Sequence, residues 1–422
     1  MYTTSDELRQ RRAALLADKA APYIAVIYSG RAPRTSADGA HGFHVDRNFY
    51  WLTNIDRENM ILVLKKTGDT VSEELYIEPF DETQAKWVGG RMLPAEASAV
   101  SGVETIRFVE DFPAALHTFI RMMRGCDGVV TVGLDLWKHT PDQDDTLAHK
   151  LAHKVQQDYP AVAIDDLYRQ FVEGRIIKSQ SEIEQMKVAQ EHTRVAIEAM
   201  WSHVRPGMNE CELAGAFDFA LAKQGITGHA FHTICAAGVR ATTLHYEENN
   251  QIINDGDLIL IDLGSTYHHY CADISRTFPA NGKFTQRQKD LYNVVLAAQD
   301  LIIESARPGM TLRQLNDMVI AFYEQELPKL GLLQDGDTVR DYYYHSVSHQ
   351  LGLDCHDITC PATAVLRPGM VITVEPGLYV EKEAIGIRIE NDIIITEDKA
   401  IDLSSRILKT VEDIEAFMAE NK

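Results

Sequence analysis

The sequence is short of positive charge and has no long apolar run. It contains 41 Lys and Arg residues against 62 Asp and Glu residues, which gives a formal net charge of −21. This excess of negative charge argues against nucleic acid as a partner, because phosphate binding requires a basic surface. No apolar run approaches the roughly 18 residues needed to span a bilayer. We therefore expect neither a nucleic-acid partner nor a membrane span.

A secretory signal and a disulfide framework are also missing from the pattern. Residues 1–18 are Arg-rich and amphipathic, without the continuous apolar stretch of a signal peptide. The cysteines are scattered and form no Cys-x-x-Cys pair, so we expect reduced thiols and no zinc knuckle. They are Cys126, Cys211, Cys235, Cys271, Cys355 and Cys360. These features predict a cytoplasmic location.

What is present is typical of a globular protein with more than one domain. The chain has 422 residues, 45% of them hydrophobic, and this length favours two or three domains. Short β-rich runs alternate with helical patterns in the first part, which predicts a mixed α/β domain over residues 1–172. A long helical pattern over residues 181–203, with Ser181 as its expected cap, opens a second domain over residues 173–422.

The second part contains an internal near-repeat. Arg-Pro-Gly-Met occurs at 205–208 and again at 307–310, each time between two helical patterns. Each helix pair is followed by a β-rich segment in which a carboxylate, Asp262 or Glu375, lies six residues after one glycine and two before another. β-rich segments can resemble each other by chance. Two related halves that face each other, each supplying one carboxylate, explain the spacing better.

Each half also predicts a hairpin with a second carboxylate. Asp262 ends an apolar run, and an antiparallel return places Asp273 opposite it if the turn centres on residues 267–268. The same counting in the second half places Glu390 opposite Glu375. Four buried carboxylates repel one another unless a positive charge lies among them, and two divalent metals would supply it.

A nearby segment offers nitrogen ligands for such a centre. His345, His349 and His356 fall within twelve residues. A single histidine is as often structural as functional. Beside four aligned carboxylates, the functional interpretation is favoured.

Several motifs resemble those of a known family, the pita-bread metallopeptidases, and the likeness is greatest to aminopeptidase P. In the second domain they are LHYEEN at 244–249, LIDLGSTYHHYCADISRTFP at 260–279, SHQLGLDCHD at 348–357, TVEPGLY at 373–379 and GIRIENDIIIT at 386–396. In the first domain, RNFYWLTNID at 47–56 and the Arg-rich opening are similar to that family's N-terminal domain. The resemblance implies an α/β protein whose second domain has a curved antiparallel sheet backed by helices.

The resemblance also implies a set of metal ligands. They would be Asp262, Asp273, His349, Glu375 and Glu390, with Asp273 and Glu390 bridging two ions. Four hard oxygen donors and one imidazole suit Mn²⁺ or Co²⁺, and Zn²⁺ is an alternative.

Catalytic roles follow from the same resemblance. Glu375 would also carry a proton from the attacking water to the leaving nitrogen, while His245 and His356 would position the substrate and stabilise the tetrahedral intermediate. His345 matches a further pocket histidine. The family commonly has His-Gly where this chain has His345-Ser346, which leaves the shape of that loop open.

Two more residues are candidates for the substrate side of the pocket. Arg388 shares a strand face with Glu390, and its alternative role is to pair with a bridging carboxylate. Tyr379 follows Glu375 by four residues and either contacts the substrate or only packs.

The activity that the resemblance implies is Xaa-Pro aminopeptidase, which hydrolyses the bond between an N-terminal residue and a following proline. Prolidase, restricted to Xaa-Pro dipeptides, is the nearest rival, and relatives acting on creatine are more remote. A pita-bread protein that only binds partners is a different class, but such proteins typically lack ligands. The resemblance further implies a homo-oligomer, either a dimer or a tetramer.

Overall fold

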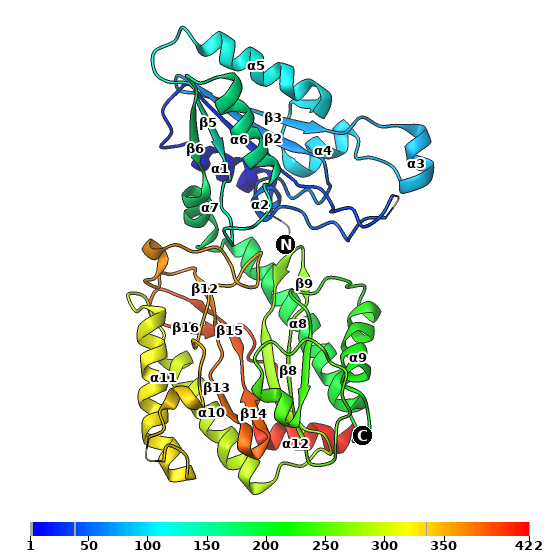
Figure 1. Ribbon diagram of the computed structural model, residues 1–422, viewed down its shortest axis with the longest axis vertical. Coiled ribbons are helices and arrows are strands. Elements are labelled where there is room, and N and C mark those ends of the chain that lie inside the picture. Colours follow the sequence, from blue (N-terminus) through cyan, green and yellow to red (C-terminus); the bar gives the residue numbers. More distant parts are fainter. Residues whose placement is uncertain (1–2, 38, 335, 422) are drawn as a thin grey trace. The chain divides into compact units, whose positions relative to one another are not determined.

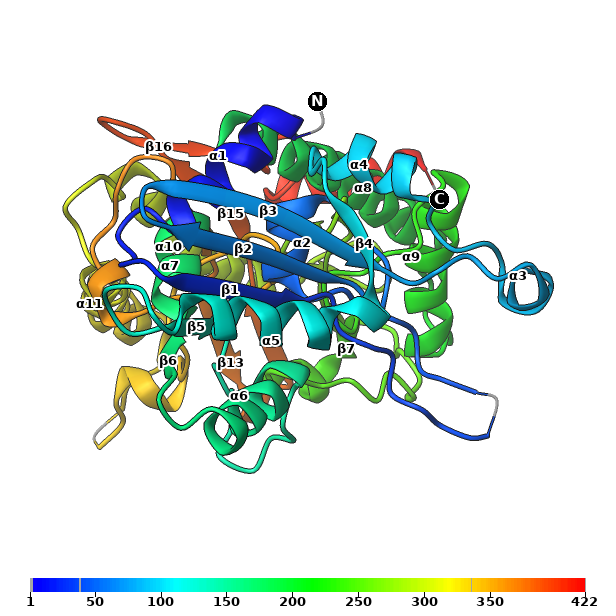
Figure 2. The ribbon, with the colours of Figure 1, turned by 90° about the horizontal axis from the view of Figure 1, so that it is seen from above.

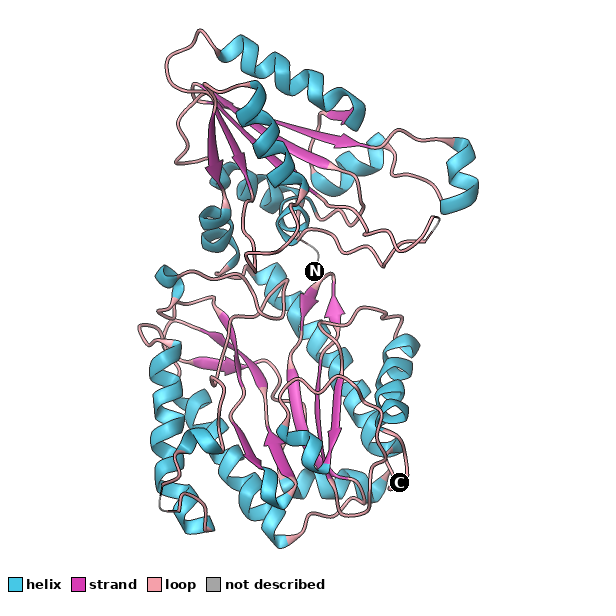
Figure 3. Cartoon of the chain, viewed as in Figure 1, coloured by secondary structure: helices cyan, strands magenta, loops and turns pink. Residues whose placement is uncertain are grey.

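The computed structural model describes residues 3–37, 39–334 and 336–421. The chain forms two compact units, of which one ends at Gly174 and the other begins at Arg175. Each unit combines helices with strands (Figure 3). The predicted α/β class is therefore confirmed.

The first unit contains a six-stranded sheet in the order β4-β3-β2-β1-β5-β6. Strands β1 to β3 pair antiparallel and lie side by side in Figure 2, while β4, β5 and β6 join the sheet in parallel. The central strand β1 is a continuous apolar run and is buried along nearly its whole length, as expected for a strand covered on both faces. The bounds are β1 Tyr23–Tyr28, β2 Ile61–Thr67, β3 Thr70–Ile77, β4 Ile106–Phe108, β5 Thr131–Leu134 and β6 Ala163–Asp166.

Helices cover this sheet through amphipathic faces. In α5, the buried residues Phe112, Leu116, Phe119 and Ile120 recur at helical spacing and pack into the same apolar cluster as the strand residue Val132. The helices are α1 Ser5–Leu15, α2 Arg47–Thr53, α3 Glu82–Val88, α4 Pro94–Ser101, α5 Phe112–Met123, α6 Leu147–Asp158 and α7 Tyr168–Arg175.

The second unit is built from two helix pairs and two sets of antiparallel strands. Helices α8 and α9 lie beside the strands of its first half, and α10 and α11 beside those of its second half (Figure 1). The helices are α8 Gln180–His203, α9 Glu210–Lys223, α10 Gln286–Ser305, α11 Leu312–Glu326 and α12 Val411–Glu420. The buried Trp201 of α8 packs edge-on against Phe278 and Phe417, which ties a strand and the last helix to the same core.

The strands of this unit pair antiparallel throughout. Those of the first half are β7 Ile234–Ala237, β8 Leu258–Leu263, β9 Thr266–Tyr267, β10 Tyr270–Cys271 and β11 Ile274–Pro279. Those of the second half are β12 Val371–Val374, β13 Gly377–Val380, β14 Ile385–Arg388, β15 Asn391–Ile395 and β16 Ala400–Asp402.

The near-repeat has the same structure in both halves. The Gly207 N–H donates to the Ile253 carbonyl at 2.8 Å, and the Gly309 N–H donates to the Leu366 carbonyl at 2.9 Å. Both glycines have positive φ, at 91° and 89°, a backbone conformation that is unfavourable for residues with a Cβ atom. The prediction of two related halves is confirmed, because both halves have the same glycine turn and the same hydrogen bond from that glycine to the segment before the next strand.

The N-cap of α8 lies two residues before the predicted one. The cap is Ser179 instead of Ser181, because the Ser179 hydroxyl accepts from the Glu182 N–H and the Glu182 carboxylate accepts from the Ser179 N–H. This reciprocal capping box satisfies two donors that the helix leaves open, whereas Ser181 lies inside the first turn.

A helix suited to crossing a membrane, with enough length and apolar character, is not found in the described part of the chain.

Candidate metal centre and active site

The first hairpin brings two carboxylates to one face, but in a register that differs from the prediction. Asp262 on β8 lies opposite Ser275 on β11, not opposite Asp273. The turn centres on His268 and His269, whose φ values of 49° and 65° fit a two-residue hairpin loop, so the predicted centre at residues 267–268 was one residue too early. Moving the centre by one residue shifts each partner by two, and Asp273 therefore stays on the face that carries Asp262.

The second hairpin has the predicted register. Val374 lies opposite Asn391, and Gly377 lies opposite Arg388, which places Glu375 and Glu390 at facing positions between the two pairs. The expected polar tip is a turn of 3₁₀ helix over Glu381–Glu383. The predicted pairing of Glu375 with Glu390 is confirmed.

Burial sets the charge state of the carboxylates. It raises the pKa of Asp262 to about 6 despite the neighbouring Arg388, and it raises the pKa of Glu375 to about 7 despite His349 and Arg388. Burial and then the charges of Asp273, Glu375 and Asp262 raise the pKa of Glu390 well above its ordinary range. The carboxylates thus resist ionising together without a cation among them.

His349 directs one ring nitrogen at this group. Its Nδ1 lies 3.0 Å from the Gln350 carbonyl and must donate to it, which leaves Nε2 available at 3.4 Å from Asp273 Oδ2 and 3.5 Å from Glu375 Oε1. Burial lowers the pKa of His349, but the contact with Asp273 and the charge of Glu375 outweigh it and raise the pKa to about 9. Positive charge is therefore favoured at Nε2, where a metal ion could replace the proton.

His345 belongs to a different hydrogen-bonded chain. Its Nδ1 donates to the Ser346 carbonyl at 2.8 Å, so its Nε2 accepts from the Tyr379 hydroxyl, also at 2.8 Å. The same hydroxyl accepts from Arg388 Nη1 at 3.1 Å. Burial, and then the charge of Arg388, lower the pKa of His345 to about 3. The imidazole is thus held neutral in one orientation.

Arg388 links this chain to the carboxylates. Its Nη2 lies 2.5 Å from Asp262 Oδ2, and its Nε donates to the Ser275 hydroxyl at 2.8 Å. The pairing expected with a bridging carboxylate is corrected, since the partner is Asp262. The reason is that β14, which carries Arg388, contacts β8, which carries Asp262, and this contact brings the two side chains together.

A single cavity of about 540 Å³ gathers nearly all the predicted site residues. Its lining includes Asp262, Asp273, Glu375, Glu390, His245, His345, His349, His356 and Arg388. Tyr379 is not among the lining residues and is only 2% exposed. For Tyr379, therefore, the structure favours packing behind the wall over contact with a substrate.

Two buried residues that the sequence interpretation missed contact Asp273 and Glu390, which line the cavity. Asp392 is fully buried, and its Oδ2 accepts from the Asp273 N–H at 3.0 Å. The Ser275 hydroxyl donates to Glu390 Oε2 at 2.7 Å. Period-two spacing after Glu390 could have revealed Asp392. No local signal marks Ser275, because its role depends on the register of the hairpin.

The donor set fits a pair of divalent ions. Asp262 lines the cavity, and its Oδ1 is buried without a hydrogen-bond partner among the described residues, so this oxygen is available to a metal ion. Potential ligand atoms of Asp273, His349 and Glu390 all lie within 4.8 Å of one another. Hard oxygen donors around one imidazole are typical of metal-dependent hydrolases.

Comparison with known proteins identifies the family. The model of metallopeptidase family M24 matches residues 184–397, and that of the aminopeptidase P N-terminal domain matches residues 8–126. The Xaa-Pro aminopeptidase of Escherichia coli K12 is 33% identical over 98% of this chain and 97% of its own. The chain therefore belongs to metallopeptidase family M24.

Solved structures agree with this assignment over the whole chain. A structure from Bacillus anthracis, described as a candidate aminopeptidase P, has a TM-score of 0.95 at 41% identity and covers 99% of both chains. Zinc-substituted E. coli aminopeptidase P in complex with product has a TM-score of 0.90 at 30% identity and covers all of both chains. The predicted family, the two-domain pita-bread fold and the hydrolase class are confirmed.

Proposed function

We propose that the protein is an Xaa-Pro aminopeptidase with a two-metal centre. The observation that carries the proposal is the gathering of four carboxylates, one free imidazole nitrogen and four further histidines, His232 among them, on one cavity. The full-length similarity to Xaa-Pro aminopeptidases supports the same activity.

Five residues would hold the ions: Asp262, Asp273, His349, Glu375 and Glu390. Asp273 and Glu390 would each serve both ions, as the family resemblance implies, and potential ligand atoms of these two residues and His349 lie within 4.8 Å of one another. When bound, two divalent ions lower the pKa of water toward neutrality and polarise the scissile carbonyl. The ions would be Mn²⁺, with Co²⁺ or Zn²⁺ as alternatives, since oxygen donors dominate.

The chain's own groups would then move the proton and stabilise developing charge. Glu375, whose Oε1 lies 3.5 Å from His349 Nε2, would take a proton from water and pass it to the proline nitrogen. His245 and His356 line the cavity at the exposed side and would donate to the oxyanion. The neutral His345, fixed by Tyr379, would form one side of the pocket for the substrate.

Metal dependence gives a first test. We expect about two divalent ions per chain and loss of activity on chelation, because the nucleophile depends on both ions. Asp273→Ala or Glu390→Ala should lose the paired centre, since a bridging ligand serves both ions. Metal analysis and activity assays check this, with Asp255→Ala, an exposed carboxylate, as control. Either bridging variant keeping both ions and a normal rate would refute the ligand assignment.

Substrate length and sequence give a second test. Proline has no backbone N–H, so peptidases that bind this N–H cannot cleave the bond before proline. A pocket shaped to the fixed proline ring can accept that bond. We expect cleavage of Ala-Pro-Ala and longer peptides, and none of an Ala-Ala control or an acetylated peptide. Preference for the dipeptide Ala-Pro would reassign the protein to prolidase, and cleavage of the acetylated peptide would exclude an aminopeptidase.

The rival classes are distinguished by the same experiments. A non-catalytic binding protein, a class that typically lacks the ligands, would show neither the two bound ions nor any turnover. The homo-oligomeric state and the cytoplasmic location remain predictions, which sedimentation and cell fractionation would check.

A further inference from the structure

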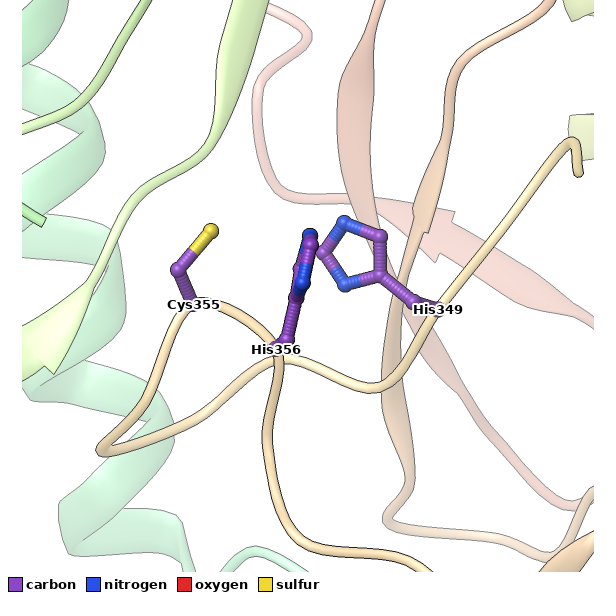
Figure 4. A group of neighbouring side chains, drawn as sticks. All are labelled: His349, Cys355 and His356. Atoms are coloured by element: carbon purple, nitrogen blue, oxygen red, sulfur yellow. The ribbon is translucent and has the colours of Figure 1, made fainter. Parts of the chain in front are cut away.

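A second possible ligand cluster lies at the edge of the proposed metal centre. Potential ligand atoms of His349, Cys355 and His356 all lie within 4.8 Å of one another. Figure 4 shows Cys355 and His356 side by side on one loop, with the His349 ring reaching toward them from the neighbouring segment. The His349 and His356 rings are 4.3 Å apart between centroids.

The thiol in this cluster faces the ligands already described. Cys355 Sγ donates to Asp273 Oδ2 at 2.9 Å, and His349 Nε2 lies 3.4 Å from the same oxygen. All three side chains line the cavity, so an ion from solvent can reach them. The donor atoms of the two sites differ. This cluster offers one sulfur and two imidazole nitrogens, whereas the main centre offers four carboxylates and one imidazole.

Donor chemistry decides which ion such a cluster would take. Mn²⁺ and other hard cations prefer oxygen, whereas thiolate and imidazole select softer ions such as Zn²⁺. Three protein ligands are sufficient for a zinc ion that completes its coordination with water.

We propose that Cys355, His356 and His349 form a soft-metal site that binds Zn²⁺ or Cd²⁺ and competes with the main centre for His349. Binding releases the thiol proton to solvent and forms the sulfur–metal bond, so charge and protons balance. The competition rests on the proposed function, because that proposal assigns His349 to the main centre. Excess zinc would then inhibit the Mn²⁺-loaded enzyme by withdrawing a ligand.

Direct metal binding tests the site without relying on activity. The full chain, loaded with Mn²⁺ and carrying Cys126→Ser and Cys211→Ser to remove exposed thiols, is titrated with Cd²⁺. The thiolate-to-cadmium charge-transfer absorption in the ultraviolet reports sulfur coordination. Cys355→Ser keeps a hydroxyl that can donate to Asp273, Cys355→Ala removes it, and Cys360→Ser is the matched control in the same region.

We expect the absorption in the background protein and in Cys360→Ser, and its loss in both Cys355 variants. Cd²⁺ affinity should fall by at least about 10–100-fold, the range found when groups supporting a metal site are removed. Inhibition of peptide cleavage by Zn²⁺ should weaken by a similar factor in Cys355→Ser. The same absorption and affinity with and without the Cys355 thiol would overturn the site. If no peptide is cleaved at all, the proposed function fails, while the cadmium absorption still decides this inference.

Discussion

Replacing Glu375 with Gln should slow the cleavage of Xaa-Pro peptides by about 10²–10⁴-fold, the usual contribution of a general acid/base group. Gln keeps the shape of the side chain but removes both the charge and the basic oxygen. In the wild-type chain, Glu375 Oε1 lies 3.5 Å from His349 Nε2 and 3.3 Å from the Thr373 hydroxyl, so the replacement is held in the same place. The measurement is kcat on Ala-Pro-Ala together with the bound metal content.

A matched control for this variant lies on the same hairpin. Glu381→Gln changes an exposed carboxylate at the tip and should leave the rate unchanged. A loss of less than about tenfold in Glu375→Gln, with metals retained, would contradict the proton-transfer role. Loss of metal with loss of rate would assign Glu375 to binding alone.

The second large effect is expected on stability, from the buried ion pairs that Asp357 forms with Arg175 and Lys178. Asp357 Oδ1 accepts from Arg175 Nη2 at 2.6 Å, and Asp357 Oδ2 accepts from Lys178 Nζ at 2.9 Å. The side chains of Asp357 and Lys178 are 1% exposed and that of Arg175 is 3% exposed. Burial raises the pKa of Asp357, but the charges of Lys178 and Arg175 outweigh it and keep the pKa below its usual range. Asp357→Ala would leave Lys178 buried without its carboxylate and remove one of the two carboxylates paired with Arg175, so it should cost about 3–5 kcal/mol of unfolding free energy.

The neighbouring Asp354 provides the control for this prediction. It pairs with the same Arg175 Nη2 at 2.7 Å, but its side chain is 38% exposed, so Asp354→Ala should cost at most about 1 kcal/mol. Urea unfolding can be followed by fluorine NMR of fluorotryptophan at Trp201, the one tryptophan after residue 174. Equal losses in the two variants would show that burial does not strengthen the Asp357 pairs.

The sequence was sufficient for features that depend on local pattern. The apolar run of β1, the turn shared by the two halves and the carboxylate at the end of each apolar run all follow from residue order. The facing positions of Glu375 and Glu390 were also predictable, because the polar tip fixes the centre of that hairpin. In the first hairpin, consecutive histidines gave no such signal, and the turn was placed one residue too early.

Some roles were ambiguous until the side chains could be located. Tyr379 could contact the substrate or only pack, and the structure places its hydroxyl between His345 and Arg388. The partner of Arg388 was equally open, and it is Asp262, 126 positions away in the chain.

By itself, the sequence determined the fold class, the family and the types of residue that gather at the site, because strand period and motif spacing are local properties. Only the tertiary structure decided which atoms meet. Asp357 finds its cations 179 and 182 positions away, and Asp392 reaches the Asp273 N–H across 119 positions. Such contacts depend on how the two halves pack, and a buried charge or donor selects its partner by proximity in the folded chain, which no local pattern encodes.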